Sequence, residues 1–352
     1  MNKMQYVSLG RSGLKVSRFG YGNWVNSSSK EEAQKACNEM VKLAFENGIN
    51  FFDTAESYGF GDGEVQIGQA LKALGVPREE YVLATKIFIG ARQTSKVVGN
   101  LMGTSRKHLI EGVNRSLKNL DHDFVDVLFC HRYDPTTPTM EVCQAMKTII
   151  ESGKAHYWAT SEWPASRIME AILMSDQIGG PRPIADQCQY SMLVRDKMEL
   201  EYGPLFDSYD YGTTIWSPLA CGVLTGKYNN GIPEDSRFAK NPELAFILNR
   251  HMGPTTKEGT VKKLNELSEV AKELDCSLAQ LALAWTIAYK HTSLAIIGAS
   301  SASQLKQNLE ALPIAEKIKG DLAQKINNIL NNAPLQETSF LTYPPRPTPN
   351  RR

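Results

Sequence analysis

The sequence lacks the features that mark secreted, membrane-spanning and nucleic-acid-binding proteins. Its 352 residues include 39 Lys and Arg against 38 Asp and Glu, so a net charge of +1 attracts neither nucleic acid nor an anionic membrane. No apolar run approaches the roughly 18 residues of a membrane span, and the start MNKMQYVSLGRSG has no apolar signal core. The six scattered cysteines form no C-x-x-C pair, which favours reduced thiols over disulfides or zinc. We therefore expect a cytoplasmic protein with no metal site, no nucleic-acid partner and no direct membrane insertion.

The chain does contain a repeated unit, in which a short apolar run ends in a polar residue and an amphipathic helical stretch follows. These runs are rich in β-branched and aromatic residues, as buried parallel strands are. The eight runs cover residues 16–23, 49–54, 81–86, 125–131, 156–162, 184–190, 212–217 and 294–300. Between them the apolar period changes to 3.6, for example at Ala33, Ala36, Cys37, Met40, Val41 and Ala44.

Eight strands alternating with helices predict an α/β fold, a (β/α)8 TIM barrel. A doubly wound sheet is the competing fold, but the first strand offers only Gly20-Tyr21-Gly22 in place of a G-x-G-x-x-G turn. Residues 5–20 have the alternation and turn of an N-terminal β-hairpin that could plug the barrel bottom. Residues 222–258 predict a long loop after the seventh strand, on the catalytic face. We expect one barrel domain over 1–335 and a disordered, proline-rich tail over 336–352.

Polar residues at the carboxyl ends of barrel strands point into the active site. The second run delivers Asp53 next to its end, Lys86 and His131 end the third and fourth runs, and Tyr58 lies in the loop after the second. A Tyr hydroxyl has a reference pKa of about 10, and a nearby Lys ammonium makes it a better proton donor. Asp53 would orient Lys86, and His131 would hydrogen-bond a substrate carbonyl. Strand ends are often polar without any function, but four titratable groups on one rim favour protonation of an oxygen while hydride reaches carbon.

A rival chemistry remains open for the same rim. Lys86 at a strand end could form a Schiff base with a carbonyl substrate, as aldolase-type enzymes do. That reaction needs no nicotinamide cofactor. Residues suited to binding a cofactor phosphate after the final strand would therefore favour reduction over Schiff-base chemistry.

The last strand leads into a helix start that suits an anion. Ser301 and Gln304 form an S-x-x-Q capping box, and a helix N-terminus after the final strand of a barrel is a ready phosphate site. Lys227 and Arg237, in the long loop, could complete such a pocket. Simple helix capping and ordinary surface charge explain the same residues equally well.

The motifs together resemble those of the aldo-keto reductases from Met4 to about Leu335. The matching segments are NFFDTAESYG, LATKIF, DVLFCHRYDPTTPTMEV, YWATSEW, DQCQYSML, WSPLACGVLTGKY, GIPEDSR and IIGASSASQLKQN. Within that superfamily, NWV, SEW and WSPLACG are most similar to the β subunits of voltage-gated potassium channels and their microbial and plant relatives.

The resemblance implies a barrel that binds NADP(H) across the carboxyl ends of its strands. It assigns the catalytic tetrad to Asp53, Tyr58, Lys86 and His131, and nicotinamide and ribose contacts to Asn23, Trp24, Ser161, Gln187 and Trp216. Pyrophosphate contacts fall on Ser217, Leu219, Cys221 and Lys227. Adenosine-phosphate contacts fall on Ser236, Arg237, Gly298, Ser300, Gln304, Gln307 and Asn308.

Two positions depart from the channel-subunit pattern. His131 stands where animal channel subunits commonly have Asn, which favours turnover over sensing alone. Glu162 replaces an Arg that often follows the Ser of the fifth strand, which puts its effect on cofactor contacts in doubt. The leading hypothesis is NADPH-dependent reduction of aldehydes or ketones to alcohols, with a small-molecule carbonyl substrate. The alternative is a cytosolic β subunit of a voltage-gated potassium channel that uses NADP(H) as a redox sensor, for which the resemblance implies a homotetramer.

Overall fold

The computed structural model describes residues 4–24, 30–91, 99–234, 236–241, 244–299 and 301–335, without the side chains of Lys30 and Arg237. Within these residues, eight parallel strands close into a barrel in the order β10-β3-β4-β5-β6-β7-β8-β9. This confirms the predicted (β/α)8 barrel and excludes the doubly wound sheet. The tail over 336–352 lies outside the described residues. The strands are β3 (Phe19–Gly22), β4 (Phe51–Asp53), β5 (Val82–Ile87), β6 (Val125–Cys130), β7 (Ala155–Ser161), β8 (Ala185–Gln187), β9 (Gly212–Ile215) and β10 (Leu294–Ile297).

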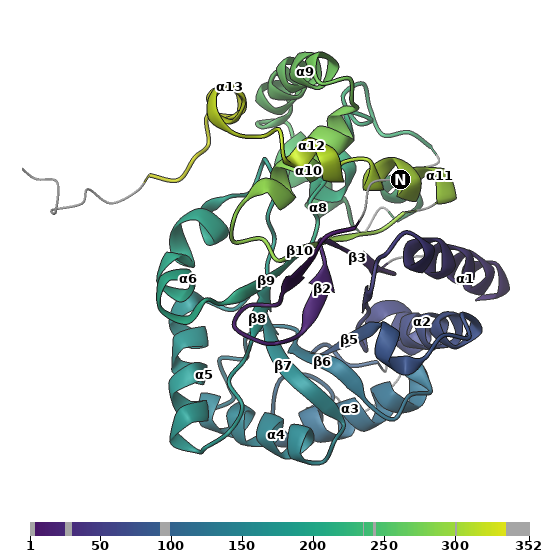
Figure 1. Ribbon diagram of the computed structural model, residues 1–352, viewed down its shortest axis with the longest axis vertical. Helices are drawn as coiled ribbons and strands as arrows, with labels where there is room; N and C mark the ends of the chain where they lie inside the picture. The colour runs from purple at the N-terminus through teal and green to yellow at the C-terminus, as the bar shows by residue number, and fades with distance from the viewer. Residues whose placement is uncertain are drawn as a thin grey trace, which may run out of the picture.

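Helices surround these strands (Figure 1), most of them amphipathic and one, α10, apolar on nearly all sides. They are α1 (Lys30–Glu46), α2 (Asp62–Ala73), α3 (Arg106–Leu120), α4 (Thr139–Glu151), α5 (Ala165–Gln177), α6 (Gly203–Tyr209), α9 (Lys257–Glu273), α10 (Leu278–Ala288), α11 (Ala302–Leu309), α12 (Leu312–Ala315) and α13 (Gly320–Leu330). The predicted apolar face of α1 is buried except at Ala36, which is exposed. The chain turns out of α1 at Gly48, whose φ of 85° is readily adopted only by glycine.

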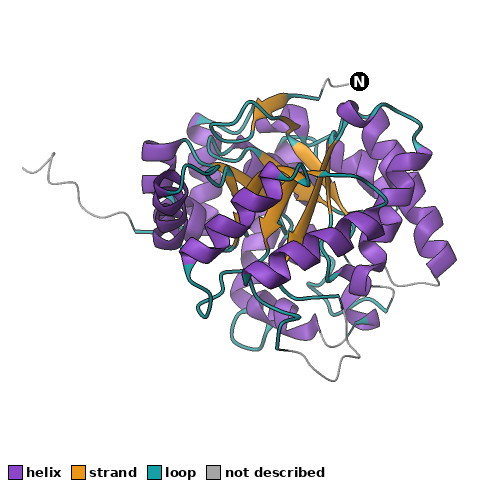
Figure 2. Cartoon of the chain, turned by 90° about the horizontal axis from the view of Figure 1, so that it is seen from below, coloured by secondary structure: helices purple, strands orange, loops and turns teal. Residues whose placement is uncertain are grey.

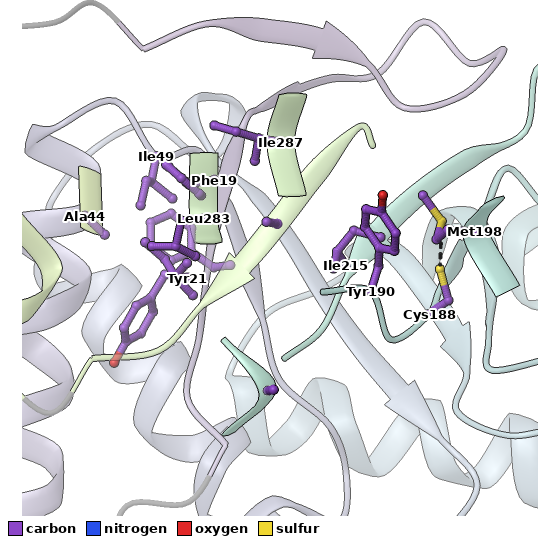
Figure 3. Packing of buried hydrophobic residues seen from close by; sticks show 14 of the residues in the cluster. Phe19, Tyr21, Ala44, Ile49, Cys188, Tyr190, Met198, Ile215, Leu283 and Ile287 are labelled. Atoms are coloured by element: carbon purple, nitrogen blue, oxygen red, sulfur yellow. Dashed lines mark hydrogen bonds between the residues drawn. The ribbon is translucent and has the colours of Figure 1, made fainter. Parts of the chain in front are cut away.

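The helices bury their apolar faces against the outer faces of the strands. Figure 3 shows Phe19 and Tyr21 of β3 gathered with Leu283 of α10 in this layer. Elsewhere in the same cluster Cys188 Sγ lies 3.3 Å from Met198 Sδ, and all six cysteines are free thiols. None of the described helices is long and apolar enough to cross a membrane.

The predicted hairpin is present as β1 (Tyr6–Ser8) and β2 (Lys15–Ser17), which pair antiparallel. Its turn residue Leu9 is fully buried against residues inside the barrel, including Phe51 and Phe129. Gly10 allows the close approach, because a Cβ there would lie 2.5 Å from the Gly212 nitrogen at the start of β9. The hairpin therefore closes the amino-terminal end of the barrel, the end at which the chain begins in Figure 2.

The long excursion between β9 and β10 is more ordered than the predicted loop. Residues 222–258 include most of a 3-10 segment, η4 (Ala220–Thr225), and two short helices, α7 (Arg237–Lys240) and α8 (Ala245–Met252). Glycine, proline and asparagine interrupt this stretch, so no single helical period runs through it. Arg250 of α8 donates to Gln189 Oε1 at 2.9 Å, which links α8 to the chain just after β8. The excursion thus reaches the carboxyl end of the barrel.

Candidate active site

Three neighbouring strands bring the predicted polar residues together at the carboxyl end of the barrel. Asp53 is the last residue of β4, Lys86 lies one residue before the end of β5, and His131 directly follows β6. Lys86 Nζ lies 2.5 Å from Asp53 Oδ2, 2.7 Å from the Thr54 carbonyl oxygen and 3.3 Å from Tyr58 Oη. Asp53 and Lys86 are almost completely buried. The result is a buried ion pair with a phenol hydroxyl beside its ammonium group.

Tyr58 comes from the turn after β4 and faces the other members of the predicted tetrad. Its amide donates to the Ala55 carbonyl at 3.0 Å, which folds the turn back toward the barrel. Its ring lies 5.9 Å from the His131 ring in a T-shaped arrangement and 6.5 Å from the Trp24 ring. The structure therefore brings Asp53, Tyr58, Lys86 and His131 into one cluster.

The surroundings of this cluster set the protonation of each group. Burial raises the pKa of Tyr58, and Lys86 only partly opposes this shift, so the phenol stays protonated. Burial alone would lower the pKa of Lys86, but Asp53 and Tyr58 outweigh it and raise the pKa, so the ammonium stays charged. Burial, helped by Lys86 and Arg132, lowers the pKa of His131 well below its usual range. At neutral pH the site holds a neutral imidazole, a phenol and an ammonium.

The direction of the Lys86 effect on Tyr58 agrees with the sequence-based expectation, but its size relative to burial does not. The sequence alone predicts that the ammonium makes the phenol a better acid. In the structure burial of the hydroxyl is the larger effect, and it favours the protonated phenol. Lys86 thus limits the rise of the Tyr58 pKa instead of producing a net fall.

The predicted nicotinamide and ribose contacts lie around this cluster at the ends of β3, β7 and β8. Gln187 Nε2 donates to Asp53 Oδ1 at 3.1 Å, and Ser161 Oγ donates to the Gln187 carbonyl at 2.9 Å. Asn23 donates to the Gly63 carbonyl at 2.7 Å. Asn23 Oδ1 and His131 Nδ1 are buried and have no hydrogen-bond partner among the described residues. A group bound at the mouth of the barrel could supply the missing partner of each atom.

Glu162 does not leave an unpaired negative charge in the site. Its carboxylate accepts from the Trp216 indole N–H at 2.8 Å, and its second oxygen lies 3.1 Å from Lys197 Nζ. Trp216 follows β9, so it belongs to the same rim. The residue whose effect the sequence left in doubt is therefore a contact of the predicted cofactor residue Trp216.

The predicted pyrophosphate residues share one tight turn after β9. Ser217, Ala220 and Cys221 all have positive φ, at 54°, 48° and 54°, although none is glycine. Ser217 Oγ accepts from the Cys221 amide at 2.8 Å. A Cβ at Gly222 would lie 3.0 Å from Lys227 Cε, so the Lys227 side chain covers this turn. Backbone strain of this kind costs free energy and clusters at functional sites, which fits a ligand-binding turn.

The predicted adenosine-phosphate residues are described only in part. Gly298 follows β10, and Ser301 caps α11 by accepting from the Gln304 amide at 3.3 Å, which is the Ser301 half of the predicted capping box. Gln304, Gln307 and Asn308 lie on α11, and Ser236, in the excursion after β9, is buried. Ser300 and the side chain of Arg237 lie outside the described residues. This part of the predicted site therefore stays a prediction.

Glu56 was not singled out in the sequence, although it lies between Asp53 and Tyr58. Its side chain is fully buried and accepts from the amides of Phe88 and Gly90 at 2.7 and 2.9 Å. His108 and Arg115 of α3 also contact it, at 3.1 and 2.7 Å. The Glu56 amide donates to the Lys86 carbonyl at 3.1 Å. Glu56 thus ties the turn that carries Tyr58 to the loop after β5, and an acidic residue inside the DTAESYG motif was the available signal.

The chain was compared with known proteins. The sequence pattern of the Aldo/keto reductase family matches residues 18–329. A Schizosaccharomyces pombe protein named "Putative voltage-gated potassium channel subunit beta" is 43% identical over 329 residues, covering 93% of this chain and 94% of its own. Two proteins named "Probable voltage-gated potassium channel subunit beta", from Oryza sativa subsp. japonica and Arabidopsis thaliana, are each 41% identical over 338 residues, covering 96% of this chain and 100% of their own. The matches extend across the barrel and its site.

Proposed function

The chain belongs to the aldo/keto reductase family, and on that premise we propose that it reduces aldehydes or ketones to alcohols with NADPH. The observation that carries this proposal is the cluster of half-buried Tyr58 with buried Lys86 and His131, in which Lys86 Nζ lies 3.3 Å from Tyr58 Oη. A protonated phenol beside an ammonium group and a neutral imidazole is an arrangement for protonating a carbonyl oxygen.

Each residue has a separate task in this proposal. The chemistry that NADP(H) supplies when bound is hydride transfer to the carbonyl carbon. Tyr58 Oη gives its proton to the carbonyl oxygen, and the Lys86 ammonium stabilises the phenolate that remains. Asp53 holds Lys86 in place through the 2.5 Å contact. His131, kept neutral by burial, donates an N–H to the carbonyl oxygen and orients it.

The residues present fit a dinucleotide. In this proposal Asn23 Oδ1, which has no partner among the described residues, would accept a hydrogen bond from the nicotinamide, and Lys227, packed against the strained turn after β9, would face the phosphates. Family members bind NAD(P)(H), and we propose NADPH in particular because Arg237 and the start of α11 offer a cation and backbone N–H groups to a 2′-phosphate. The same assignment places Ser217, Leu219 and Cys221 against the pyrophosphate.

The Schiff-base alternative is disfavoured by the state of Lys86. A Lys nucleophile must lose its proton, but three acceptors lie within 3.3 Å of Lys86 Nζ and its pKa is raised. Treatment with borohydride in the presence of a carbonyl substrate should therefore add no substrate mass to Lys86.

The direct test is turnover by the purified protein. We expect saturable consumption of NADPH with at least one member of a panel of aliphatic and aromatic aldehydes, and formation of the matching alcohol. Binding of NADPH without turnover of any carbonyl in the panel would contradict the reductase proposal. It would favour the second candidate.

That second candidate is a β subunit of a voltage-gated potassium channel, favoured by the names of relatives that are 41–43% identical over most of the chain. The two functions are compatible, because one protein can both reduce a carbonyl and bind a partner. This candidate implies a homotetramer. Light scattering that gives the mass of a single 39.1 kDa chain at micromolar concentration would count against it and leave the reductase proposal standing. Recovery of a potassium channel with the tagged protein from its native cells would support it.

A further inference from the structure

One carboxylate joins the carboxyl ends of three consecutive barrel strands. Glu162 directly follows β7 in a left-handed conformation, with a φ of 57°. Its amide donates to the Gln187 carbonyl of β8 at 3.1 Å. Its Oε1 accepts from the Gln189 amide at 2.5 Å and from the Trp216 indole N–H, after β9, at 2.8 Å. The indole of Trp216 is therefore fixed from β7 through a single side-chain oxygen.

Lys197 balances the charge of this carboxylate. Its Nζ lies 3.1 Å from Glu162 Oε2, and only about a fifth of each side chain is exposed, at 20% and 22%. Burial alone would lower the pKa of Lys197, but Glu162 and Asp186 outweigh it and raise the pKa, so the ammonium stays charged. Without this cation, a largely buried negative charge would remain next to the mouth of the barrel.

A basic residue could not do what Glu162 does. Two donors, the Gln189 amide and the Trp216 indole N–H, point at one atom, and an Arg side chain has donors only. An Arg at this position could therefore not hold the indole through its N–H, and in this chain Lys197 supplies a positive charge from a neighbouring segment.

We propose that Glu162 is a positioning residue, which with Lys197 as its counter-ion holds the Trp216 indole in one orientation at the cofactor face. The part of this inference that concerns the cofactor rests on the proposed NADPH-dependent function. Loss of the acceptor frees the indole to rotate, so the cofactor must order it on binding. Glu162→Ala should therefore weaken NADPH binding about tenfold, in line with the loss of one charge-assisted hydrogen bond. Tyr58 and Lys86 are untouched, so the rate at saturating NADPH should stay within about threefold of wild type.

The test reads the indole directly by ¹⁹F NMR of protein labelled with 5-fluorotryptophan. The chain has five tryptophans, and the variant Trp216→Phe assigns the Trp216 resonance by its disappearance. We expect this resonance to shift and broaden in Glu162→Ala, together with the loss of NADPH affinity. The double variant Glu162→Gln/Lys197→Met keeps an acceptor oxygen and removes both charges of the pair, but it also removes the cation that acts on the Asp186 carboxyl. It should therefore recover part of the resonance position and part of the affinity that Glu162→Ala loses.

The matched control is Asp126→Asn. Asp126 also accepts a backbone amide, that of Leu83 at 2.7 Å, and pairs with Arg78 at 2.6 Å, but it lies near the amino ends of β5 and β6. This variant should lose stability while leaving the Trp216 resonance and NADPH affinity unchanged. If it moved them as much as Glu162→Ala does, the effect would be a general consequence of losing a carboxylate, and the positioning role would be overturned.

An unchanged Trp216 resonance in Glu162→Ala, or NADPH affinity within about twofold of wild type, would overturn the proposal. If Glu162→Ala does not fold, Glu162→Gln alone tests the proposal. The amide nitrogen of the new Gln side chain would face the Lys197 ammonium, and two donors cannot hydrogen-bond to each other. The Trp216 resonance should therefore still shift. A wild-type protein that binds no NADPH would remove the proposed function, whereas the resonance would still report whether Glu162 holds the indole.

Discussion

The two ends of the barrel are built from the same strands, yet they bury different kinds of side chain. At the amino end, Leu9 and Val16 of the hairpin region pack with Phe51 and Val127 in a wholly apolar cluster. At the carboxyl end, an ammonium and a carboxylate are buried together, with side-chain exposures of 0% and 3% for Lys86 and Asp53. Apolar burial stabilises a fold, whereas burying charge carries a large desolvation cost.

The difference indicates which end serves the fold and which serves chemistry. Among the described residues, the buried side-chain atoms without a hydrogen-bond partner include Asn23 Oδ1, Thr54 Oγ1 and His131 Nδ1. These three residues directly follow β3, β4 and β6, whereas other such atoms, Arg78 Nε among them, lie away from this rim. Positive φ values in Ser217, Ala220 and Cys221 add strain at the same end. Such costs persist where function requires them, and in barrels of this type that is the carboxyl face.

The largest expected effect on stability comes from removing the buried cation. Lys86→Met leaves Asp53 buried without its partner, so we expect a loss of about 3–5 kcal/mol in the free energy of unfolding, measured in urea. Lys86→Met/Asp53→Asn should recover part of this loss. Lys72→Met removes an exposed cation that pairs with Asp121 near the amino end. This change should alter the free energy of unfolding by less than about 1 kcal/mol. Equal losses in Lys86→Met and Lys72→Met would contradict the contrast between the two ends.

The matching change at the amino end is Leu9→Ala. Leu9 is fully buried, so the cavity and lost transfer free energy should destabilise the protein by about 2–5 kcal/mol. Because the hairpin is at the opposite end from Tyr58, the turnover per folded molecule should not change. Leu173→Ala, at a side chain 56% exposed, is the control and should stay within about 0.5 kcal/mol of wild type. A fall in turnover of folded Leu9→Ala would show that the two ends are coupled.

The phosphate side of the carboxyl end is tested by cofactor choice. A 2′-phosphate contact is worth about 1.5–3 kcal/mol, or roughly 10–150-fold in affinity. We expect NADPH to bind at least about tenfold tighter than NADH, and Arg237→Ala to remove most of that ratio while barely changing NADH affinity. Titrations of both cofactors measure the ratio. Equal dissociation constants in the wild type would mean that the phosphate pocket is wrongly assigned.

The smallest effect concerns pH. The folded pKa of His131 lies well below its unfolded value of about 6.5, so the unfolded state takes up the proton first as pH falls. Stability should therefore fall as pH drops below about 6.5, by at most about 1.4 kcal/mol per pH unit from this group. His131→Asn removes that contribution while keeping the fold and some activity. Urea unfolding at about pH 7 and pH 5 should show a smaller acid loss in the variant than in the wild type; an identical loss would mean that His131 titrates normally.

Much of the architecture could be predicted from local pattern, because buried parallel strands and amphipathic helices have different periods. The functional importance of Lys86 could also be predicted, because a Lys near the end of an apolar strand places a charge where burial is costly. In the structure all six residues of β5 are buried. The four tetrad positions follow from strand order, since parallel neighbours bring their carboxyl ends to one rim.

Contacts between side chains that are far apart in the sequence could not be predicted from local sequence patterns. Glu56 binds Phe88, Gly90, His108 and Arg115, which are 32 to 59 positions away, and no local pattern reports such partners. The pairing of Glu162 with Lys197 depends in the same way on how the chain after β8 returns to the rim. The helices α7 and α8 were missed because glycine and proline interrupt the surrounding sequence.

The central claim, that the carboxyl end protonates a carbonyl oxygen through Tyr58, is tested most directly by the single-turnover rate of Tyr58→Phe with NADPH and an aldehyde that the wild type reduces. The variant removes one hydroxyl and keeps the ring that packs near His131. We predict NADPH affinity close to that of the wild type and a rate of carbonyl reduction lower by about 10²–10⁴, the usual contribution of a general acid. A rate within about threefold of the wild type would contradict the account, because a group that supplies the proton cannot be removed at so small a cost.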